Sequence, residues 1–207
     1  IFHGDIIKIL LLSAPSGLNV AGTQGQFVFV EVTEMLSVTF KVSLISGLLM
    51  AFPFILFQVI LFVAPGLTSK ERKYFLAFVP GIVLSFAAGA GFGYFVLIPP
   101  AINFLLGWGS DLATPMIRIG NYINVVLMLL FWMGVVFETP MVMFILAKLK
   151  IVSYMAFSRW RRYWIVVAFI LGGLITPTFD PVNQSLVALP LILLYELGIL
   201  LARVAGK

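Results

Sequence analysis

The sequence predicts an all-α integral membrane protein, and three observations support this prediction. The chain of 207 residues is 62% hydrophobic and only 10% charged, whereas soluble domains carry roughly 25% charged residues. Its mean hydropathy is +1.14. Its charges lie in short clusters, and long uncharged stretches such as 42–69, 74–110 and 119–137 separate them. A helix of about 18 or more apolar residues can cross a ~30 Å hydrocarbon core, so we expect a single transmembrane domain over residues 1–207.

The cations predict the direction of each span. Ten of the 13 Lys and Arg residues fall in three groups, at 70–73, 148–162 and 203–207. The positive-inside rule places these groups on the cytoplasmic side, so an even number of spans must separate successive groups. We therefore expect five spans, at about 35–64, 74–98, 119–147, 162–177 and 183–202.

Residues 1–34 are then expected to form an extracytoplasmic segment. Residues 6–12 are apolar apart from Lys8. They are too short to span, and they lack the basic start and cleavage site of a signal peptide. An external start without a preceding span is unusual for a bacterial membrane protein. We therefore expect the sequence to be a fragment that lacks one upstream helix.

The second span contains two features that predict its shape. It is expected to end near Pro99 and Pro100, because prolines remove backbone donors and interrupt helices. Residues 101–110 would then form a short outer helix or a re-entrant segment. Earlier in the same span, Gly89, Gly91 and Gly93 lie close together, and small residues at such spacing favour close packing against a neighbouring helix.

The last two spans are predicted to be short. The uncharged run 163–179 rises only about 25 Å as a helix. Helices of this length thin the bilayer locally or lie against longer neighbours. A tight polar turn at 176–181 is expected to connect the two spans.

The composition excludes most catalytic functions. The chain has no cysteine and one histidine, His3, so disulfides, thiolate metal sites and a histidine metal site are not expected. The sequence contains neither a Gly-x-Ser-x-Gly nor a Gly-x-x-x-x-Gly-Lys motif. The net charge of +5 does not indicate nucleic acid, because the cations lie between hydrophobic runs. We expect a protein that is not an enzyme and needs no cofactor.

Glu138 is the polar residue that most needs an explanation, because it lies inside a predicted span. A charge at bilayer depth costs about 2.5–3.5 kcal/mol on translocon scales. Glu138 should therefore face protein or a wet cavity, or be protonated. In a structural interpretation, a protonated Glu138 solvates the turn that Pro140 loosens, since Pro140 cannot bond to the carbonyl of Val136. In a functional interpretation, Glu138 takes part in binding or gating.

Glu71 also has two interpretations. Thr68 and Glu71 form a capping-box pattern at the start of a helix, and neighbouring cations can neutralise the acid. Alternatively, Glu71 receives a basic ligand at the cytoplasmic surface, because a carboxylate pairs bidentately with a guanidinium group.

Thr176 and Gln184 flank the outer turn between the last two spans. They are either ordinary interfacial polar residues or hydrogen-bond partners for another helix in the membrane. Such interhelical hydrogen bonds contribute about 0.6–2 kcal/mol. Glu196 is expected to be an interfacial charge near Arg203, and Lys41 is expected to snorkel outward.

Taken in order along the chain, these segments resemble the TatC family, the polytopic subunit of the twin-arginine protein translocase. The resemblance covers nearly the whole chain and depends on a collinear set of short motifs: Thr33-Glu34 through Lys41, Phe57-Gln58, Ala64-Pro65-Gly66-Leu67, Lys70-Glu71-Arg72, Gly93-Tyr94-Phe95, Phe137-Glu138-Thr139-Pro140, Arg161-Arg162-Tyr163, Thr176-Pro177 with Asp180 and Gln184, Ala188-Leu189-Pro190 and Tyr195-Glu196.

The resemblance implies a glove-shaped bundle of six helices, of which the first is missing here, in a bacterial inner membrane. It implies that Glu71, with Phe62, Leu67 and Arg72 beside it, binds twin-arginine signal peptides. It maps the family's buried glutamate to Glu138 and its partner-helix contacts to Thr176 and Gln184.

The implied function is that of a receptor and scaffold that exports folded proteins with the proton gradient. Its partners would be twin-arginine signal peptides, single-span TatA/TatB-type subunits, membrane lipid and further copies of itself. A different class of function stays open from the residues alone, namely a proton-coupled secondary transporter of a small solute that uses Glu138.

Overall fold

The fold is almost entirely helical in the part of the chain that the structure describes. The structure is a computed structural model, and it describes residues 3–12, 31–63, 69–107, 117–176 and 180–205, with the side chains of 3, 60, 61, 63 and 69–78 left out. The helical elements in chain order are α1 (His3–Leu12), α2 (Glu34–Val63), α3 (Ser69–Phe92), the π-helical turn η2 (Gly93–Leu97), α4 (Ile98–Gly107), α5 (Ile119–Phe137), α6 (Thr139–Lys148), α7 (Tyr154–Ile175) and α8 (Pro181–Ala205).

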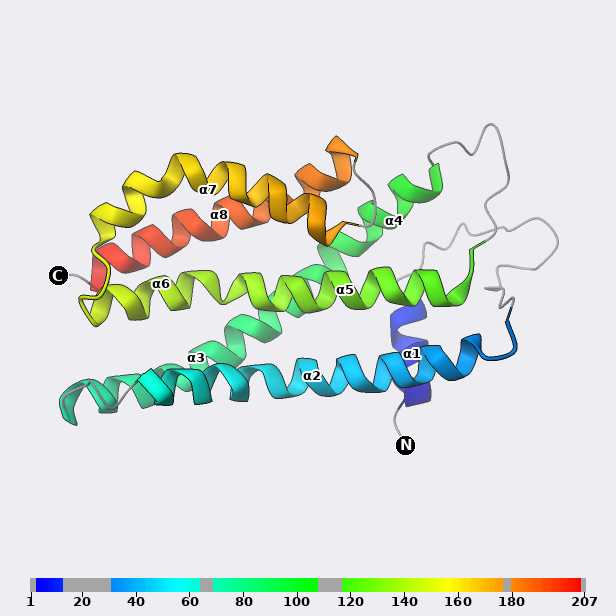
Figure 1. Cartoon of the computed structure of the whole chain (residues 1–207), viewed down its shortest axis with the longest axis horizontal. Helices are drawn as coiled ribbons and strands as arrows, with labels where there is room; N and C mark the ends of the chain where they lie inside the picture. Colours follow the sequence, from blue (N-terminus) through cyan, green and yellow to red (C-terminus); the bar gives the residue numbers. More distant parts are fainter. Residues whose placement is uncertain (1–2, 13–30, 64–68, 108–116, 177–179, 206–207) are drawn as a thin grey trace.

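The long helices run back and forth along one axis of the molecule (Figure 1). Helices α2, α5–α6 and α8 run in one direction, and α3–α4 and α7 run in the other. The starts of α3 and α7 and the ends of α6 and α8 therefore meet at one end of the bundle. The three predicted cation groups border these helix ends. The chain therefore runs along the bundle and back between one cation group and the next, as an even number of passes requires.

Four stretches of the described chain are helical, long enough and apolar enough to cross a membrane. They are Glu34–Val59, Val79–Gly107, Ile119–Lys148 and Pro181–Ala205. The predicted span 162–177 is not among them, because α7 carries Arg159, Arg161 and Arg162 in its first half. Helix α7 packs along the whole of α8, and its passage through the membrane stays a prediction.

The helix does not stop at the two prolines, and the short helix expected after them is present as α4, whereas the end of the membrane span near them stays a prediction. The chain continues as helix through η2 and α4 to Gly107. A π-helical turn at Gly93–Leu97 lies directly before Pro99 and Pro100, and these prolines fall in the first turn of α4. Proline is tolerated there because the first turn needs no intrahelical donor. The wide turn thus restarts the helix instead of ending it.

Helix α5 forms the centre of the bundle. Its neighbours are α2, α3, η2 and α8, and Ile123, Val126 and Met133 have no exposed surface. Helix α2 instead exposes apolar side chains such as Phe40 and Leu44 over much of its length. Exposed apolar side chains on a long, predominantly apolar helix are what contact with lipid requires.

Two of the three glycines predicted to allow close packing do so. A methyl group at Gly89 would lie 2.6 Å from the carbonyl oxygen of Met133, and one at Gly93 would lie 3.2 Å from Cβ of Met133. At Gly91 no atom of the described residues lies within 4 Å of that position, so the close packing predicted for this stretch is made through Gly89 and Gly93. The alternation follows from helix geometry, since residues two apart do not share a face.

The short helix α1 lies in the half of the bundle that is away from the basic groups (Figure 1). Its Ile7 and Leu10 are buried in the main core. The hydroxyl of Tyr94 donates to the carbonyl of Ile9 at 2.6 Å, and that of Tyr122 donates to the carbonyl of Leu10 at 3.2 Å. Two tyrosine side chains therefore hold α1 against the bundle through its backbone carbonyls. Helix α1 itself is too short to span a membrane.

Candidate functional site

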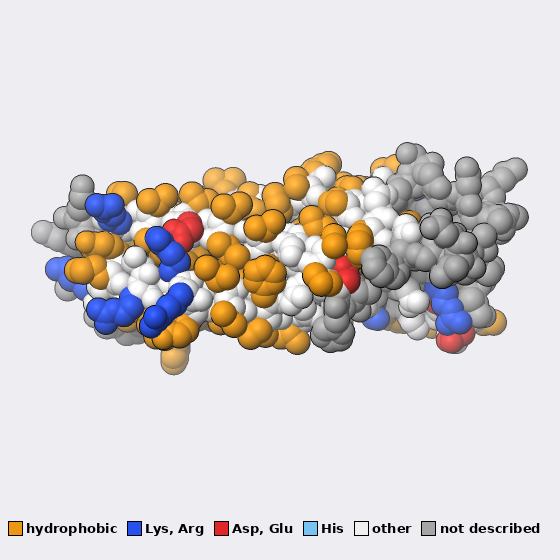
Figure 2. All heavy atoms as spheres, turned by 90° about the horizontal axis from the view of Figure 1, so that it is seen from above, with side chains coloured by type: hydrophobic (Ala, Val, Ile, Leu, Met, Phe, Trp, Pro, Cys, Tyr) orange, Lys and Arg blue, Asp and Glu red, His pale blue; other side chains and the backbone are white. Residues whose placement is uncertain are grey.

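One end of the bundle carries a dense group of cations. Figure 2 shows Lys and Arg side chains gathered at this end, beside a face that is covered mainly by hydrophobic side chains. The guanidinium group of Arg161 pairs with the carboxylate of Glu196 at 2.7 Å. Glu196, expected to be an interfacial charge, thus joins α8 to α7 through this ion pair. Trp160 and Tyr163 are exposed beside these charges, as is usual at a membrane interface.

The predicted signal-peptide site borders this basic end but is only partly described. Phe62 lies in the last turn of α2 and is 85% exposed. Glu71 and Arg72 lie in the first turn of α3, but their side chains fall outside the description, and Leu67 and Thr68 lie outside the described residues. The capping box and the receptor role of this group therefore both stay predictions.

Glu138 lies at the junction of α5 and α6, deep in the bundle. Its side chain is 3% exposed, so the expectation that it faces protein is confirmed. The junction is a helix irregularity, because the Glu138 N–H donates to Val135 at 3.1 Å and Pro140 follows in the first turn of α6. Helix α3 reaches the same level, where the hydroxyl of Ser85 donates to the carbonyl of Phe137 at 2.6 Å.

Neither carboxyl oxygen of Glu138 has a hydrogen-bond partner among the described residues. Whether a protonated Glu138 solvates the turn that Pro140 loosens, or takes part in binding or gating, stays a prediction. A buried polar group without a partner costs about 1–3 kcal/mol. The hydrogen bonds of the described residues therefore do not account for the burial of this carboxyl.

Thr176 and Gln184 make hydrogen bonds within the chain. Thr176 is buried at the end of α7, and its hydroxyl donates to the carbonyl of Gly172 at 2.8 Å. The amide of Gln184 donates to the carbonyl of Phe169 at 2.7 Å, which ties α8 to α7. The close approach of these helices depends on Gly172, where a methyl group would lie 2.8 Å from the backbone oxygen of Gln184. A contact of either side chain with a partner helix stays a prediction.

Sequence reasoning missed a polar interface between α2 and α5 at the end opposite the cations. The carboxylate of Glu34 accepts from the Gly120 N–H at 3.1 Å, and the ammonium group of Lys41 donates to Asn124 at 3.1 Å. Lys41 thus bonds to a neighbouring helix, where free snorkelling was expected. The signal was present, because Glu34 and Lys41 share one face of α2, and Asn121 and Asn124 share one face of α5.

With this geometry in place, the comparisons with known proteins identify the family. The family model described as "Sec-independent protein translocase protein (TatC)" matches residues 1–190. The chain belongs to the TatC family. The predicted family, the helical membrane fold and the absence of an enzymatic role are thereby confirmed, because TatC is a non-enzymatic subunit of a protein translocase.

Relatives of known sequence and structure agree with this assignment. The TatC protein of Carboxydothermus hydrogenoformans is 43% identical over 178 residues, which are 86% of this chain and 73% of the relative. The TatC protein of a Synechocystis species is 40% identical over 207 residues, which are 100% of this chain and 78% of the relative. A crystal structure of the twin-arginine translocase receptor TatC has a TM-score of 0.83 at 36% identity and covers 100% of this chain and 89% of its own.

Membership in the TatC family also confirms the predicted location. The chain is a multi-pass protein of the bacterial inner membrane and a component of the Sec-independent protein translocase. The solute-transporter alternative has no counterpart among these relatives, all of which are translocase or TatC-like proteins.

Proposed function

We propose that this chain is the signal-peptide receptor and scaffold subunit of a twin-arginine translocase. The observation that carries the proposal is the buried carboxyl of Glu138, whose oxygens have no partner among the described residues. A group that destabilises the fold is retained when it serves a ligand. The solved relative is itself called a twin-arginine translocase receptor, which supports the same role.

The peptide would enter at the basic end of the bundle, where α3 begins. The twin arginines would pair with Glu71, and the apolar segment that follows them would extend along the bundle toward Glu138. Ser85 marks the level of Glu138 on α3, and the rise from Glu71 to Ser85 is about 21 Å at 1.5 Å per residue. A helical apolar segment of roughly 14 residues covers that distance.

The energy for export would come from the proton gradient. The sequence offers no phosphate-cradling Gly-x-x-x-x-Gly-Lys loop for a nucleotide, and the resemblance to twin-arginine translocases favours the gradient. Export into vesicles with an imposed gradient, with and without a protonophore, tests this part. Uptake of a small solute by proteoliposomes that hold this chain alone would instead favour the transporter alternative.

Glu71→Ala is expected to weaken photocrosslinking between this chain and a twin-arginine signal peptide by about tenfold. The reason is that one bidentate, charge-assisted pair contributes about 1.5–3 kcal/mol. The measurement uses a photoreactive residue beside the twin arginines and membranes that hold equal amounts of the inserted protein. Glu196→Ala is the matched control, because it removes another carboxylate from the same end. Unchanged crosslinking in Glu71→Ala would remove Glu71 from the receptor site.

Single-span subunits would pack along α7 and α8, whose outer faces carry exposed apolar side chains such as Ile170, Leu189 and Leu193. Gln184→Leu is expected to reduce copurification of a small single-span subunit severalfold, because it removes the amide that can bond to a helix in the membrane. Ser185→Ala is the matched control, since the Ser185 hydroxyl donates to the Pro181 carbonyl one turn earlier in the same helix. An unaltered complex in Gln184→Leu would count against the contact.

A further inference from the structure

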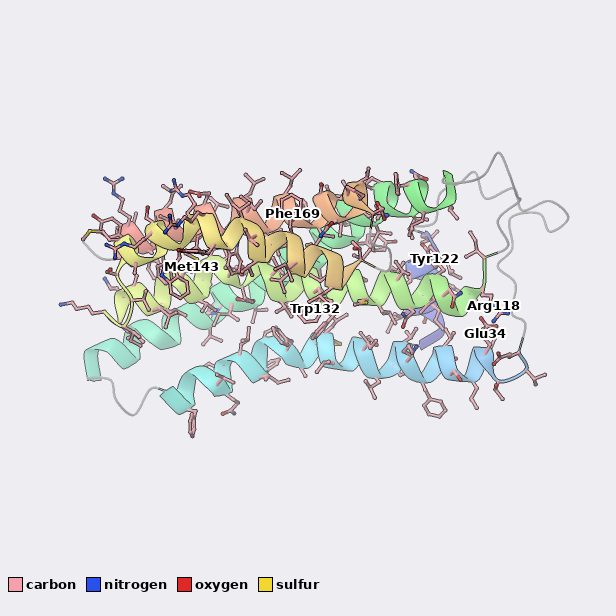
Figure 3. The ribbon with its side chains drawn as sticks, turned by 45° about the horizontal axis from the view of Figure 1, so that its top comes forward. Glu34, Arg118, Tyr122, Trp132, Met143 and Phe169 are labelled. Atoms are coloured by element: carbon pink, nitrogen blue, oxygen red, sulfur yellow. The ribbon has the colours of Figure 1, made fainter. Side chains whose placement is uncertain are left out.

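One face of α7 carries two arginines, an aromatic ring and an aliphatic side chain in succession. Residues three or four positions apart are neighbours on a helix surface, so Arg159 lies beside Arg162 and Tyr163. Val166 follows one turn later on the same face, and all four side chains are exposed. Figure 3 shows side chains with nitrogen atoms at their tips that point away from the ribbons at this end of the bundle.

The two arginines form no ion pair with a carboxylate among the described side chains. Arg161, which lies between them in the sequence, pairs with Glu196 at 2.7 Å. Residues 148–162 and 196–205 hold six cations, and Glu196 is the one acid in these two segments. The described part of the basic end therefore keeps an excess of positive charge that an anion would neutralise.

The guanidinium group of Arg162 is held against the ring of Tyr163. Its Cζ atom lies 4.8 Å from the ring centroid, and the group donates to the Tyr163 hydroxyl at 2.9 Å. A guanidinium group has five N–H donors, so most of them remain available to a ligand. Arg159 lies one turn earlier, about 4.5 Å along the helix axis at 1.5 Å per residue. Two guanidinium groups at this spacing can bond to the oxygens of one phosphate, with which arginine pairs bidentately.

The neighbouring side chains place the arginines at the level of lipid headgroups. Trp160 and Tyr163 are exposed beside them, and Trp and Tyr are typical of the boundary between membrane and water. Farther along α7, Val166 and Ile170 are exposed and aliphatic. Figure 2, which looks from the side on which α7 lies in Figure 1, shows mainly hydrophobic side chains next to the cations. A phosphate between the arginines would have this hydrocarbon surface beside it, as a phospholipid requires and a soluble phosphate ester does not.

We propose that this face of α7 binds phosphatidylglycerol from the leaflet at the basic end of the bundle. The phosphate lies between Arg159 and Arg162, and an acyl chain lies along Val166. A lipid with an ammonium group is disfavoured, because its cation would join an excess of cations and Glu196 is already paired with Arg161. The proposal does not depend on the acids of the proposed receptor function, so the two are tested separately.

The test is lipid binding to the purified full chain by native mass spectrometry, with glycerol, ethanolamine and choline phospholipids of identical acyl chains. The unaltered protein is expected to bind phosphatidylglycerol several times more tightly than the other two lipids. The double variant Arg159→Gln with Arg162→Gln is expected to bind it on the order of tenfold more weakly, which corresponds to about 1.4 kcal/mol. The matched control is Lys8→Gln with Arg118→Gln, which removes two exposed cations outside the basic end and should leave binding unchanged.

A second double variant, Arg159→Lys with Arg162→Lys, keeps both charges but lacks the planar fork that pairs with phosphate. It is expected to bind phosphatidylglycerol more weakly than the unaltered protein and more tightly than the Gln variant. Full binding by the Lys variant, equal affinity for all three lipids, or an equal loss in the matched control would overturn the proposal. Displacement of the lipid by an equal concentration of soluble glycerophosphoglycerol would also overturn it, because the acyl chains would then contribute nothing.

Discussion

Replacing Glu138 with Leu is expected to reduce export of a twin-arginine cargo at least tenfold without lowering the stability of the protein. The two effects separate because the carboxyl is 3% exposed and has no hydrogen-bond partner among the described residues. Removing it relieves a desolvation cost of about 1–3 kcal/mol in the resting protein. The thermal unfolding midpoint in detergent should therefore stay the same or rise. The export assay and the unfolding assay use the same purified preparation.

Glu196→Leu is the matched control for this variant. It also removes a carboxylate, but one that is partly exposed and pairs with Arg161 at the surface. Exposed ion pairs contribute little to stability, so both export and unfolding should change little. If Glu138→Leu instead unfolds at a markedly lower temperature, the carboxyl contributes to the fold and the receptor interpretation loses its main support.

The variant Glu138→Gln tests whether export needs the charge of Glu138. The amide keeps the hydrogen-bonding capacity of the side chain and abolishes its ionisation. We expect export by Glu138→Gln to fall between that of the unaltered protein and that of Glu138→Leu. Full export by the Gln variant would show that ionisation of Glu138 plays no part.

Gly89→Ala is expected to destabilise the protein by about 1–3 kcal/mol, the usual cost of inserting a methyl group into a packed core. The new methyl group would lie 2.6 Å from the carbonyl oxygen of Met133 and 2.7 Å from Cβ of Phe137. Neither atom can move by a side-chain rotation, so α3 and α5 must separate. The measurement is the unfolding midpoint in detergent micelles.

Gly91→Ala is the matched control two residues along the same helix. No atom of the described residues lies within 4 Å of its added methyl group, and alanine is the better helix former by up to about 1 kcal/mol. This variant should be as stable as the unaltered protein or more stable. Equal losses in the two variants would mean that the α3–α5 contact is not as close as the structure has it.

Much of the architecture could be predicted from the sequence because a bilayer imposes simple rules. The length of an uncharged run determines whether a helix can span, and the cation groups determine how many passes lie between them. The burial of Glu138 followed from the same reasoning, since a carboxyl inside a span must face protein or water. These properties depend on the solvent and not on which helix is the neighbour.

The tertiary structure alone decided which groups meet. Pro99 and Pro100 do not end their helix, because a π-helical turn precedes them and they lie in the first turn of α4. Gln184 bonds to the carbonyl of Phe169, and Lys41 bonds to Asn124. Each of these depends on the register of two helices that are distant in the sequence. The sequence determined by itself which buried groups need protein around them and which stretches are apolar enough to cross a membrane, whereas side-chain partners depend on how the helices pack, which hydropathy and charge do not specify.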